Sequence, residues 1–315
     1  MPPPPPPPLK SLTLILSPYH NGLRNLGPGA GPPRLLSHNL LAALRSTGVP
    51  LLSIVDDLDP SSPSTPLDGD IPRIFELFRR TSLAVSRARA AGSFPIVVSG
   101  DCGASVGVAA GLLQSGCVTD KELGCVWFDA HDDLNTPDTL ASGYFDSMPI
   151  AMLAGLCWKG LLATIPGFRP LSLDGLVHCG LRDVTALERQ RVEEAGYDVV
   201  WGDAGRKVDF VGELGTALDG ERHRGQPKLV HLDLDCLDVS LGKVNQFSAP
   251  GGLFEDDLLG CLEAIAAKTQ PLSLTVAAFD PRFEGADRIA DVAVQAIKGF
   301  VMALVKNGVL LAQEE

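Results

Sequence analysis

Short, continuously apolar runs alternate with longer helical patterns along most of this chain. Two examples are GCVWFDA at residues 124–130 and KLVHLDL at 228–234, in which apolar residues follow one another without regular polar alternation. Strands of this kind are buried on both faces, as in parallel sheets covered by helices. The alternation therefore predicts an α/β fold with a mostly parallel central sheet and helices on both faces.

The expected elements follow from these patterns. Strands are expected at residues 12–16, 51–55, 95–99, 125–129, 176–179, 198–201, 229–233 and 273–278. Helices are expected at 35–45, 71–91, 104–114, 148–156, 186–195, 255–267 and 287–306. Residues 56–70 and 202–226 are expected to be surface loops, the second around a short helical piece. Neither loop is polar enough to indicate a domain boundary, so residues 10–315 are predicted to form a single domain.

Composition narrows the possible functions. The net charge of −12 argues against nucleic acid or an anionic membrane as a partner. Seven cysteines without a CxxC pair favour free thiols and a cytoplasmic location. No stretch reaches the roughly 20 apolar residues of a membrane span. The MPPPPPPPLK start does not have the pattern of a signal peptide, and residues 1–9 are expected to form a disordered proline-rich arm.

Two acidic clusters directly follow predicted strands. Asp129, His131 and Asp133 alternate after CVWF, and Asp233 and Asp235 alternate after LVHL. Alternate residues of an extended chain project to the same side, and ligands of parallel sheets bind at the carboxyl ends of the strands.

Four carboxylates directed at one crevice would repel one another without a cation. Oxygen-rich ligands together with a histidine suit Mn²⁺, with Zn²⁺ or Fe²⁺ as alternatives. A single D-x-D pattern is more often a turn or a cap, but two of them behind buried strands favour a metal site.

These motifs resemble those of the arginase and agmatinase (ureohydrolase) family. The resemblance rests on DAHDDLNTPDTLASG, HLDLDCLD, GGLFEDDLL, GLRDV and AFDP, in order from about residue 95 onward. HLDLDCLD stands for the family's S-x-D-x-D-x-x-D, and SGDCGAS occupies the place of G-G-D-H-S. The resemblance implies a three-layer α/β/α sandwich that holds two Mn²⁺ ions with a bridging hydroxide, and self-association into a homo-oligomer.

Carried onto this chain, the resemblance implies a set of site residues. The metal ligands would be Asp129, His131, Asp133, Asp233 and Asp235, with Cys102 at the position of the family's sixth ligand, a histidine. Asn135 and Ser142 match positions that hold a substrate carboxylate.

The chain also departs from the family. Asp146 occupies the position of the family's proton-shuttling histidine. Thr185 occupies the position of the aspartate that binds the substrate ammonium group. Ala278 replaces the glutamate that pairs with the guanidinium group, a role that Asp280 or Glu284 could take over. Arginine itself is therefore not the expected substrate, and a modified guanidine is.

The leading hypothesis is a metal-dependent hydrolase of a small linear amidine or guanidino compound, with Asp133, Asp146 and Cys102 in catalysis. One alternative is an inactive metal-binding scaffold or regulatory protein. Another makes Cys102 a nucleophile at a helix N-terminus. Four other residues receive structural interpretations: His20, His38 and His223 as surface or loop residues, and Trp127 as core. His231 is interpreted as support for the metal ligands at most.

Overall fold

A computed structural model describes residues 7–56, 58–60, 69–118 and 122–313. Its centre is an eight-stranded parallel sheet in the order β4-β1-β5-β10-β9-β6-β7-β8. The strands are β1 (Ser11–Ser17), β4 (Leu51–Val55), β5 (Ser93–Ser99), β6 (Gly124–Phe128), β7 (Leu176–Leu181), β8 (Asp198–Trp201), β9 (Pro227–Asp233) and β10 (Gln270–Ala277). A separate antiparallel pair joins β2 (Tyr19–His20) to β3 (Leu23–Arg24).

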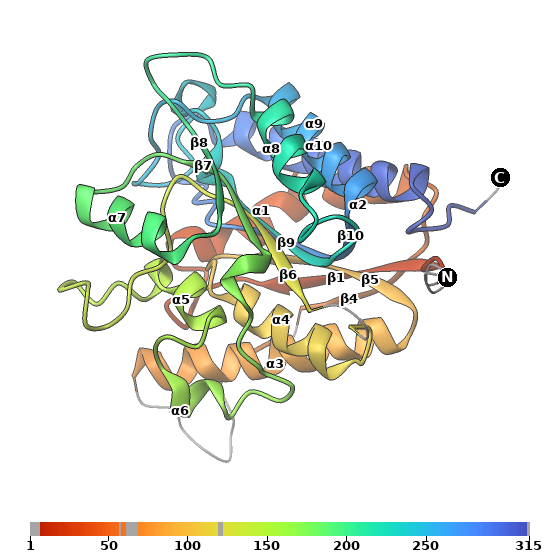
Figure 1. Cartoon of the computed structure of the whole chain (residues 1–315). Coiled ribbons are helices and arrows are strands. Elements are labelled where there is room, and N and C mark those ends of the chain that lie inside the picture. Colours follow the sequence, from red (N-terminus) through yellow and green to blue (C-terminus); the bar gives the residue numbers. More distant parts are fainter. Residues whose placement is uncertain (1–6, 57, 61–68, 119–121, 314–315) are drawn as a thin grey trace.

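Helices cover both faces of the sheet, as Figure 1 shows. One layer contains α1 (Gly31–Ser37), α2 (Leu40–Arg45), α8 (Phe210–Asp219), α9 (Glu255–Lys268) and α10 (Ala286–Lys306). The other contains α3 (Asp70–Ala90), α4 (Ala104–Gln114), α5 (Pro149–Leu153), α6 (Lys159–Leu162) and α7 (Ala186–Ala195). The predicted three-layer α/β/α architecture is confirmed.

Strand β6 shows why its sequence lacks polar alternation. Val126 and Phe128 pack into the core beneath α8–α10, whereas Cys125 and Trp127 pack into the core on the α3–α4 side. All five residues of the strand are buried. Both faces of the strand are therefore excluded from water, as the continuous apolar run predicts.

The prediction of one continuous helix at residues 35–45 is wrong. The segment forms two helices, α1 and α2, separated at His38 and Asn39. Asn39 has φ +66°, a left-handed conformation that a continuous helix cannot contain. The helix predicted at 148–156 is shorter, because it ends at Leu153, and the loop predicted at 202–226 contains the ten-residue helix α8.

Both ends of the chain and two loops lie partly outside the described residues, one of the loops at residues 119–121. Of the expected proline arm, residues 1–6 are not described, and Leu9 forms a parallel bridge with Leu310. Of the expected loop at 56–70, residues 57 and 61–68 are not described. No described helix is both long enough and apolar enough to cross a membrane, and all seven cysteines are free thiols.

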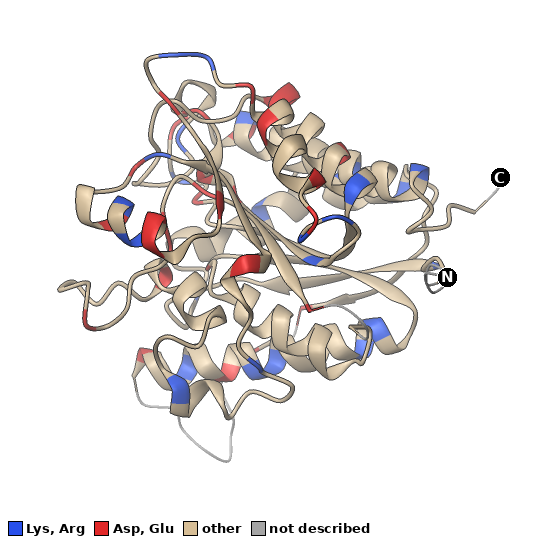
Figure 2. Ribbon diagram, viewed as in Figure 1, with Lys and Arg blue, Asp and Glu red and all other residues tan. Residues whose placement is uncertain are grey.

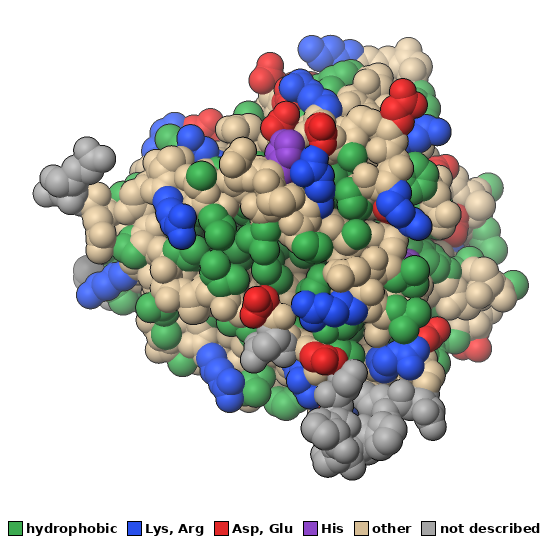
Figure 3. All heavy atoms as spheres, turned by 180° about the vertical axis from the view of Figure 1, so that it is seen from behind, with side chains coloured by type: hydrophobic (Ala, Val, Ile, Leu, Met, Phe, Trp, Pro, Cys, Tyr) green, Lys and Arg blue, Asp and Glu red, His purple; other side chains and the backbone are tan. Residues whose placement is uncertain are grey.

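The surface is mixed in character. Figure 2 shows acidic segments among the loops at the carboxyl ends of β6 to β9, while α3 carries several arginines. The reverse side, seen in Figure 3, has a hydrophobic area among scattered charges. The edge strand β4 exposes Leu52 and Ile54, at 54% and 41%.

A buried polar chain lies at the amino-terminal end of β9. Lys228 Nζ donates to Gly175 O (2.6 Å) and to His223 Nδ1 (2.9 Å), and His223 Nε2 donates to Asp198 (2.7 Å). Both Lys228 and His223 have 0% exposure. His223, interpreted as a surface or loop residue, does lie in a loop but is not on the surface. Burial, reinforced by the nearby Arg222, lowers the pKa of Lys228 to about 7.

This lowered pKa predicts a stability that depends on pH. Between pH 7 and the ordinary lysine value near 10.4, the unfolded chain holds the proton that folded Lys228 has lost. Stability from this group therefore rises with pH through that window, by at most about 1.4 kcal/mol per pH unit. Urea denaturation of the wild type and of Lys228→Met at pH 7.5 and 9.5 measures it. If the free energy of unfolding of Lys228→Met increases between pH 7.5 and 9.5 as much as that of the wild type, Lys228 is not the source of the pH dependence.

Candidate active site at the carboxyl edge of the sheet

A cavity of about 580 Å³ opens at the carboxyl ends of the central strands. Its walls come from six regions: the segments that follow β1, β5, β6, β7, β9 and β10. Residues from both predicted acidic clusters line it, together with Cys102, Asn135, Ser142, Asp146 and Asp280.

The sheet register explains how the two clusters meet. Strands β6 and β9 are neighbours, with Phe128 paired to Leu232. The next residues in register are Asp129 and Asp233, which are 1% and 4% exposed. Two acidic stretches about 100 residues apart in sequence therefore converge because their parallel strands end side by side.

The first group of converging side chains contains Asp129, His131 and Asp235. His131 Nδ1 lies 3.4 Å from a carboxylate oxygen of each aspartate. Asp129 also accepts from the backbone N–H of His131 (2.8 Å) and from Trp127 Nε1 (3.0 Å), while Asp235 accepts from Asn245 Nδ2 (3.1 Å). Their possible ligand atoms all lie within 4.8 Å of one another.

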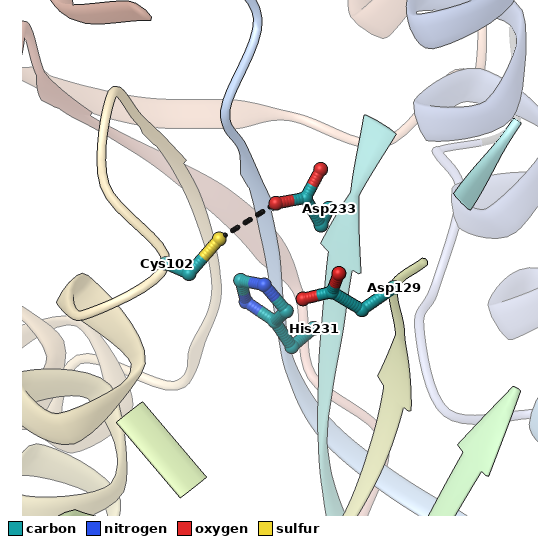
Figure 4. A group of neighbouring side chains, drawn as sticks. All are labelled: Cys102, Asp129, His231 and Asp233. Carbon is teal, nitrogen blue, oxygen red and sulfur yellow. Dashed lines mark hydrogen bonds between the residues drawn. The ribbon is translucent and has the colours of Figure 1, made fainter. Parts of the chain in front are cut away.

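The second group contains Cys102, Asp129, His231 and Asp233, drawn in Figure 4. Cys102 lies in the loop between β5 and α4, and its thiol donates to Asp233 Oδ2 at 2.9 Å. His231 lies on β9 two residues before Asp233, on the same side of the strand. The two groups share Asp129, so this carboxylate lies between them.

The fourth predicted carboxylate, Asp133, is also buried in the cavity wall. Its Oδ2 has no hydrogen-bond partner, and it is only 4% exposed. Its backbone has φ +48°, in the left-handed region that non-glycine residues rarely adopt. The carbonyl of Asp133 accepts from the N–H groups of Ile150 and Ala151, which ties this turn to the start of α5. Asp133 is not part of either compact group of possible ligand atoms.

The basic side chain paired with these carboxylates is His131, which lies 3.4 Å from Asp129 and from Asp235. No described lysine or arginine forms an ion pair with Asp129, Asp133, Asp233 or Asp235. Burial, together with the neighbouring carboxylates, raises the pKa of Asp133 and Asp233 well above its ordinary value. Buried like charges of this kind are unfavourable unless a cation or protons neutralise them. The oxygen, nitrogen and sulfur donors therefore fit a divalent metal ion.

The histidines of the site respond to these surroundings in opposite ways. Burial opposes charge on His131, but Asp235 and the other nearby carboxylates outweigh it and raise the pKa of His131. Burial, reinforced by His178, lowers the pKa of His231 well below its ordinary value. The His231 imidazole is therefore neutral, as a metal ligand must be.

Sequence reasoning missed His20. It was interpreted as a surface or loop residue, but it lines the cavity with its side chain only 12% exposed. His20 Nδ1 lies 2.5 Å from Asp101 Oδ1, and Asp101 Oδ2 accepts from the Asn21 N–H (3.0 Å). Asp146 completes this group, because its possible ligand atom lies within 4.8 Å of those of His20 and Asp101. No spacing motif connects positions 20, 101 and 146, so only the fold could reveal the cluster.

Several positions expected to bind substrate are already engaged within the protein. Asn135 donates to Glu188 (3.1 Å) and accepts from Arg191 (2.8 Å). Ser142 Oγ accepts from the Tyr144 N–H at 3.3 Å. Thr185 does not line the cavity, and its hydroxyl takes part in the capping box of α7.

The two carboxylates considered as replacements at Ala278 are also unsuited to that role. Both oxygens of Asp280 accept from Arg282. Glu284 is exposed and does not line the cavity. Neither side chain therefore supplies the free carboxylate that is missing from the cavity at Ala278.

A single arginine holds the loop after β9 in place. Arg182, just beyond β7, donates to one backbone carbonyl of β7 itself and to five of the segment that follows β9, at 2.8–3.2 Å. Its acceptors are Gly180, Asp235, Cys236, Leu237, Ala249 and Pro250. The position of Asp235 therefore depends on a residue that does not itself line the cavity.

Comparisons with known proteins agree with this geometry. The sequence profile of the arginase family matches residues 11–303. An arginase from Saccharomyces cerevisiae is 26% identical over 300 residues, covering 86% of this chain and 88% of the yeast protein. The crystal structure of Bacillus caldovelox arginase has a TM-score of 0.77 at 22% identity and covers 93% of this chain and 98% of its own. Formimidoylglutamase from Bacillus subtilis has a TM-score of 0.72 at 17% identity and covers 94% and 88%.

Proposed function

We propose, since the chain belongs to the arginase family, that it is a metal-dependent hydrolase of a small linear amidine or guanidino compound. Members of the family are ureohydrolases, which act on C–N bonds other than peptide bonds. One observation carries the proposal: Asp129, Asp133, Asp233 and Asp235 meet in one cavity, and no described lysine or arginine pairs with them.

The residues that would hold the metal are Asp129, His131, Asp133, Asp233, Asp235 and Cys102. Mn²⁺ is the expected ion, with Zn²⁺ or Fe²⁺ as alternatives, because most of the donors are carboxylate oxygens. When bound, such an ion supplies a Lewis acid and lowers the pKa of a coordinated water. Trp127 and Asn245 orient two of the carboxylates through the hydrogen bonds described above.

The cavity does not favour arginine as substrate. Asn135, Ser142 and Thr185, expected to hold the amino-acid end, are bonded within the protein. Ala278 offers no carboxylate to a guanidinium group, and Asp280 is paired with Arg282. We therefore propose a guanidino or amidino substrate whose other end is not an α-amino acid.

The Cys102-nucleophile alternative receives less support. The thiol is 2% exposed and donates to Asp233. Burial and the surrounding carboxylates raise its pKa, which disfavours the reactive thiolate. The inactive-scaffold alternative is distinguished only by turnover. Cytoplasmic location and homo-oligomer formation, expected from the sequence, remain part of this proposal.

The experiment that tests the function is a substrate panel. Full-length protein loaded with Mn²⁺, Zn²⁺, Co²⁺ or Fe²⁺ is incubated with linear guanidines and amidines, some with and some without an α-amino acid end, and the released amine is measured. We expect turnover that a chelator abolishes, highest for compounds without the amino-acid end. Turnover that survives complete metal removal would favour Cys102 chemistry, and no turnover with any metal would favour the scaffold.

His20 is the group best placed to carry a proton for the leaving amine. Its ring faces the cavity, and Asp101 fixes its orientation. Burial opposes charge on His20, but the hydrogen bond that Asp101 accepts from the ring, together with the negative charge of Asp101, prevails and raises the pKa of His20. His20 Nε2 also lies 3.1 Å from the side-chain nitrogen of Asn21, and one oxygen of Asp146 accepts from the Gly103 N–H (3.0 Å).

Replacing His20 by glutamine is therefore expected to lower kcat by about 10²-fold or more, the usual contribution of general acid–base catalysis. KM should change little. As the acid, His20 loses its proton as pH rises through its raised pKa, so the alkaline decline of wild-type kcat should disappear in His20→Gln. His38→Gln is the matched control, because His38 forms a similar pair with Asp291 on the surface. If His20→Gln and His38→Gln lower kcat by the same factor, His20 has no specific role in catalysis.

A further inference from the structure

His231 has one ring nitrogen bonded and the other without a partner. The residue is 0% exposed, and its Nδ1 lies 2.8 Å from Ser105 Oγ. Its ring stacks on Trp127, with centroids 3.6 Å apart and an interplanar angle of 20°. The imidazole is therefore fixed on one side by a hydroxyl and on one face by an indole, so its orientation is determined.

The unpartnered atom is Nε2. Figure 4 shows one ring nitrogen of His231 pointing into the space bounded by Cys102, Asp129 and Asp233. Since Nδ1 is bonded to Ser105, that nitrogen is Nε2. A buried polar atom left without a partner costs about 1–3 kcal/mol, so a closed core rarely keeps one.

The protonation of the ring makes Nε2 a potential ligand. When Nδ1–H donates to Ser105 Oγ, Nε2 carries a lone pair. That lone pair is directed at a group of buried atoms that themselves need a cation. Hydrogen bonding of one ring nitrogen while the other binds metal is the usual arrangement for metal-binding histidines.

We propose that His231 is a metal ligand that acts together with Cys102, Asp129 and Asp233. This inference rests on the proposed function and deepens it. The imidazole missing from position 102 is supplied from β9 instead, where the signature quoted above has serine. The resulting donor set is one sulfur, one nitrogen and two carboxylates.

This donor set predicts which metal the position takes. Thiolate and imidazole favour Zn²⁺, Co²⁺ or Fe²⁺ over Mn²⁺, which prefers oxygen ligands. The other group, Asp129, His131 and Asp235, contains no sulfur. The two positions are therefore expected to differ in metal preference, and the one with Cys102 and His231 is the softer.

Cobalt binding to the full chain tests this inference without relying on turnover. Co²⁺ is titrated into metal-free wild type, Cys102→Ser, His231→Ser and His178→Gln, with bound metal measured by elemental analysis. Wild type is expected to show a sulfur-to-cobalt charge-transfer band and intense visible bands typical of low coordination number. His178→Gln is the matched control, because it removes a buried imidazole on β7 that belongs to neither group of ligand atoms.

We expect His231→Ser to change the visible bands and to weaken Co²⁺ and Zn²⁺ binding at this position by at least about tenfold, the minimum for loss of even an outer metal contact. His178→Gln should keep the wild-type spectrum. Circular dichroism of each metal-free variant verifies folding, and His231→Asn is a second substitution should serine unfold the chain. If both His231 variants fold and still show the wild-type Co²⁺ spectrum and the wild-type affinity for Co²⁺ and Zn²⁺, the inference is overturned. A wild type that binds no Co²⁺, Zn²⁺ or Mn²⁺ would overturn it together with the proposed function, whereas metal binding that is indifferent to His231 overturns the inference alone.

Discussion

Replacing Asp129 by asparagine is expected to lower kcat/KM by about 10³-fold or more. Asparagine matches aspartate in shape but keeps only one of its two acceptors, because the His131 N–H and Trp127 Nε1–H donate to different carboxylate oxygens. The negative charge shared by both groups of ligand atoms is lost. A catalytic metal contributes several kcal/mol of charge stabilisation in the transition state, and about 4 kcal/mol corresponds to three orders of magnitude.

The matched control is Asp238→Asn, which makes the same substitution in the HLDLDCLD segment after β9. Asp238 caps a short 3₁₀ turn and accepts from the N–H groups of Gly251 and Gly252, and it does not line the cavity. Steady-state kinetics on the best compound of the substrate panel, with bound metal measured in parallel, makes the comparison. Asp129→Asn with near wild-type activity would show that the reaction does not depend on this carboxylate.

Replacing Arg182 by methionine is expected to destabilise the fold by about 1.5–3 kcal/mol or more, because one hydrogen bond to a charged group already contributes that much and six are lost. Methionine keeps much of the apolar stem but none of the donors that reach six backbone carbonyls. Metal affinity should fall as well, because the released segment carries Asp235.

Arg182→Lys separates charge from geometry. A lysine keeps the positive charge but offers a compact ammonium group instead of a planar fork, so it should recover only part of the stability. Urea denaturation with metal and with a chelator measures the free energy of unfolding of all three proteins. Full recovery by lysine, or a loss below about 1 kcal/mol in Arg182→Met, would contradict the role given to this network.

The sequence was sufficient for the sheet and for the two acidic clusters. Doubly buried strands leave long apolar runs, and polar residues directly after such runs lie at the carboxyl edge in any parallel sheet. All eight predicted strands are present, and β4 and β8 have the predicted bounds. The break between α1 and α2 was missed because it depends on a left-handed Asn39, for which the local sequence has no glycine or proline signal.

The finer structure of the cavity could not be predicted from the sequence. His20 joins Asp101 and Asp146 only because the segment after β1 folds over the carboxyl edge, and such contacts leave no spacing pattern. His231 lies at a position that alternation did place on the same side as Asp233. Its importance depends on the unpartnered Nε2 and on the distance to Cys102, which only coordinates provide.

The most direct test of the account is whether the cavity holds a divalent cation. Metal-free protein is dialysed against Mn²⁺ and Zn²⁺, bound metal is measured by elemental analysis, and the free energy of unfolding is determined with and without metal. The account predicts stoichiometric binding and a gain of about 2.7 kcal/mol when free metal is 100-fold above its Kd, with both effects lost in Asp129→Asn. A folded wild-type protein that retains no metal and gains no stability would contradict it.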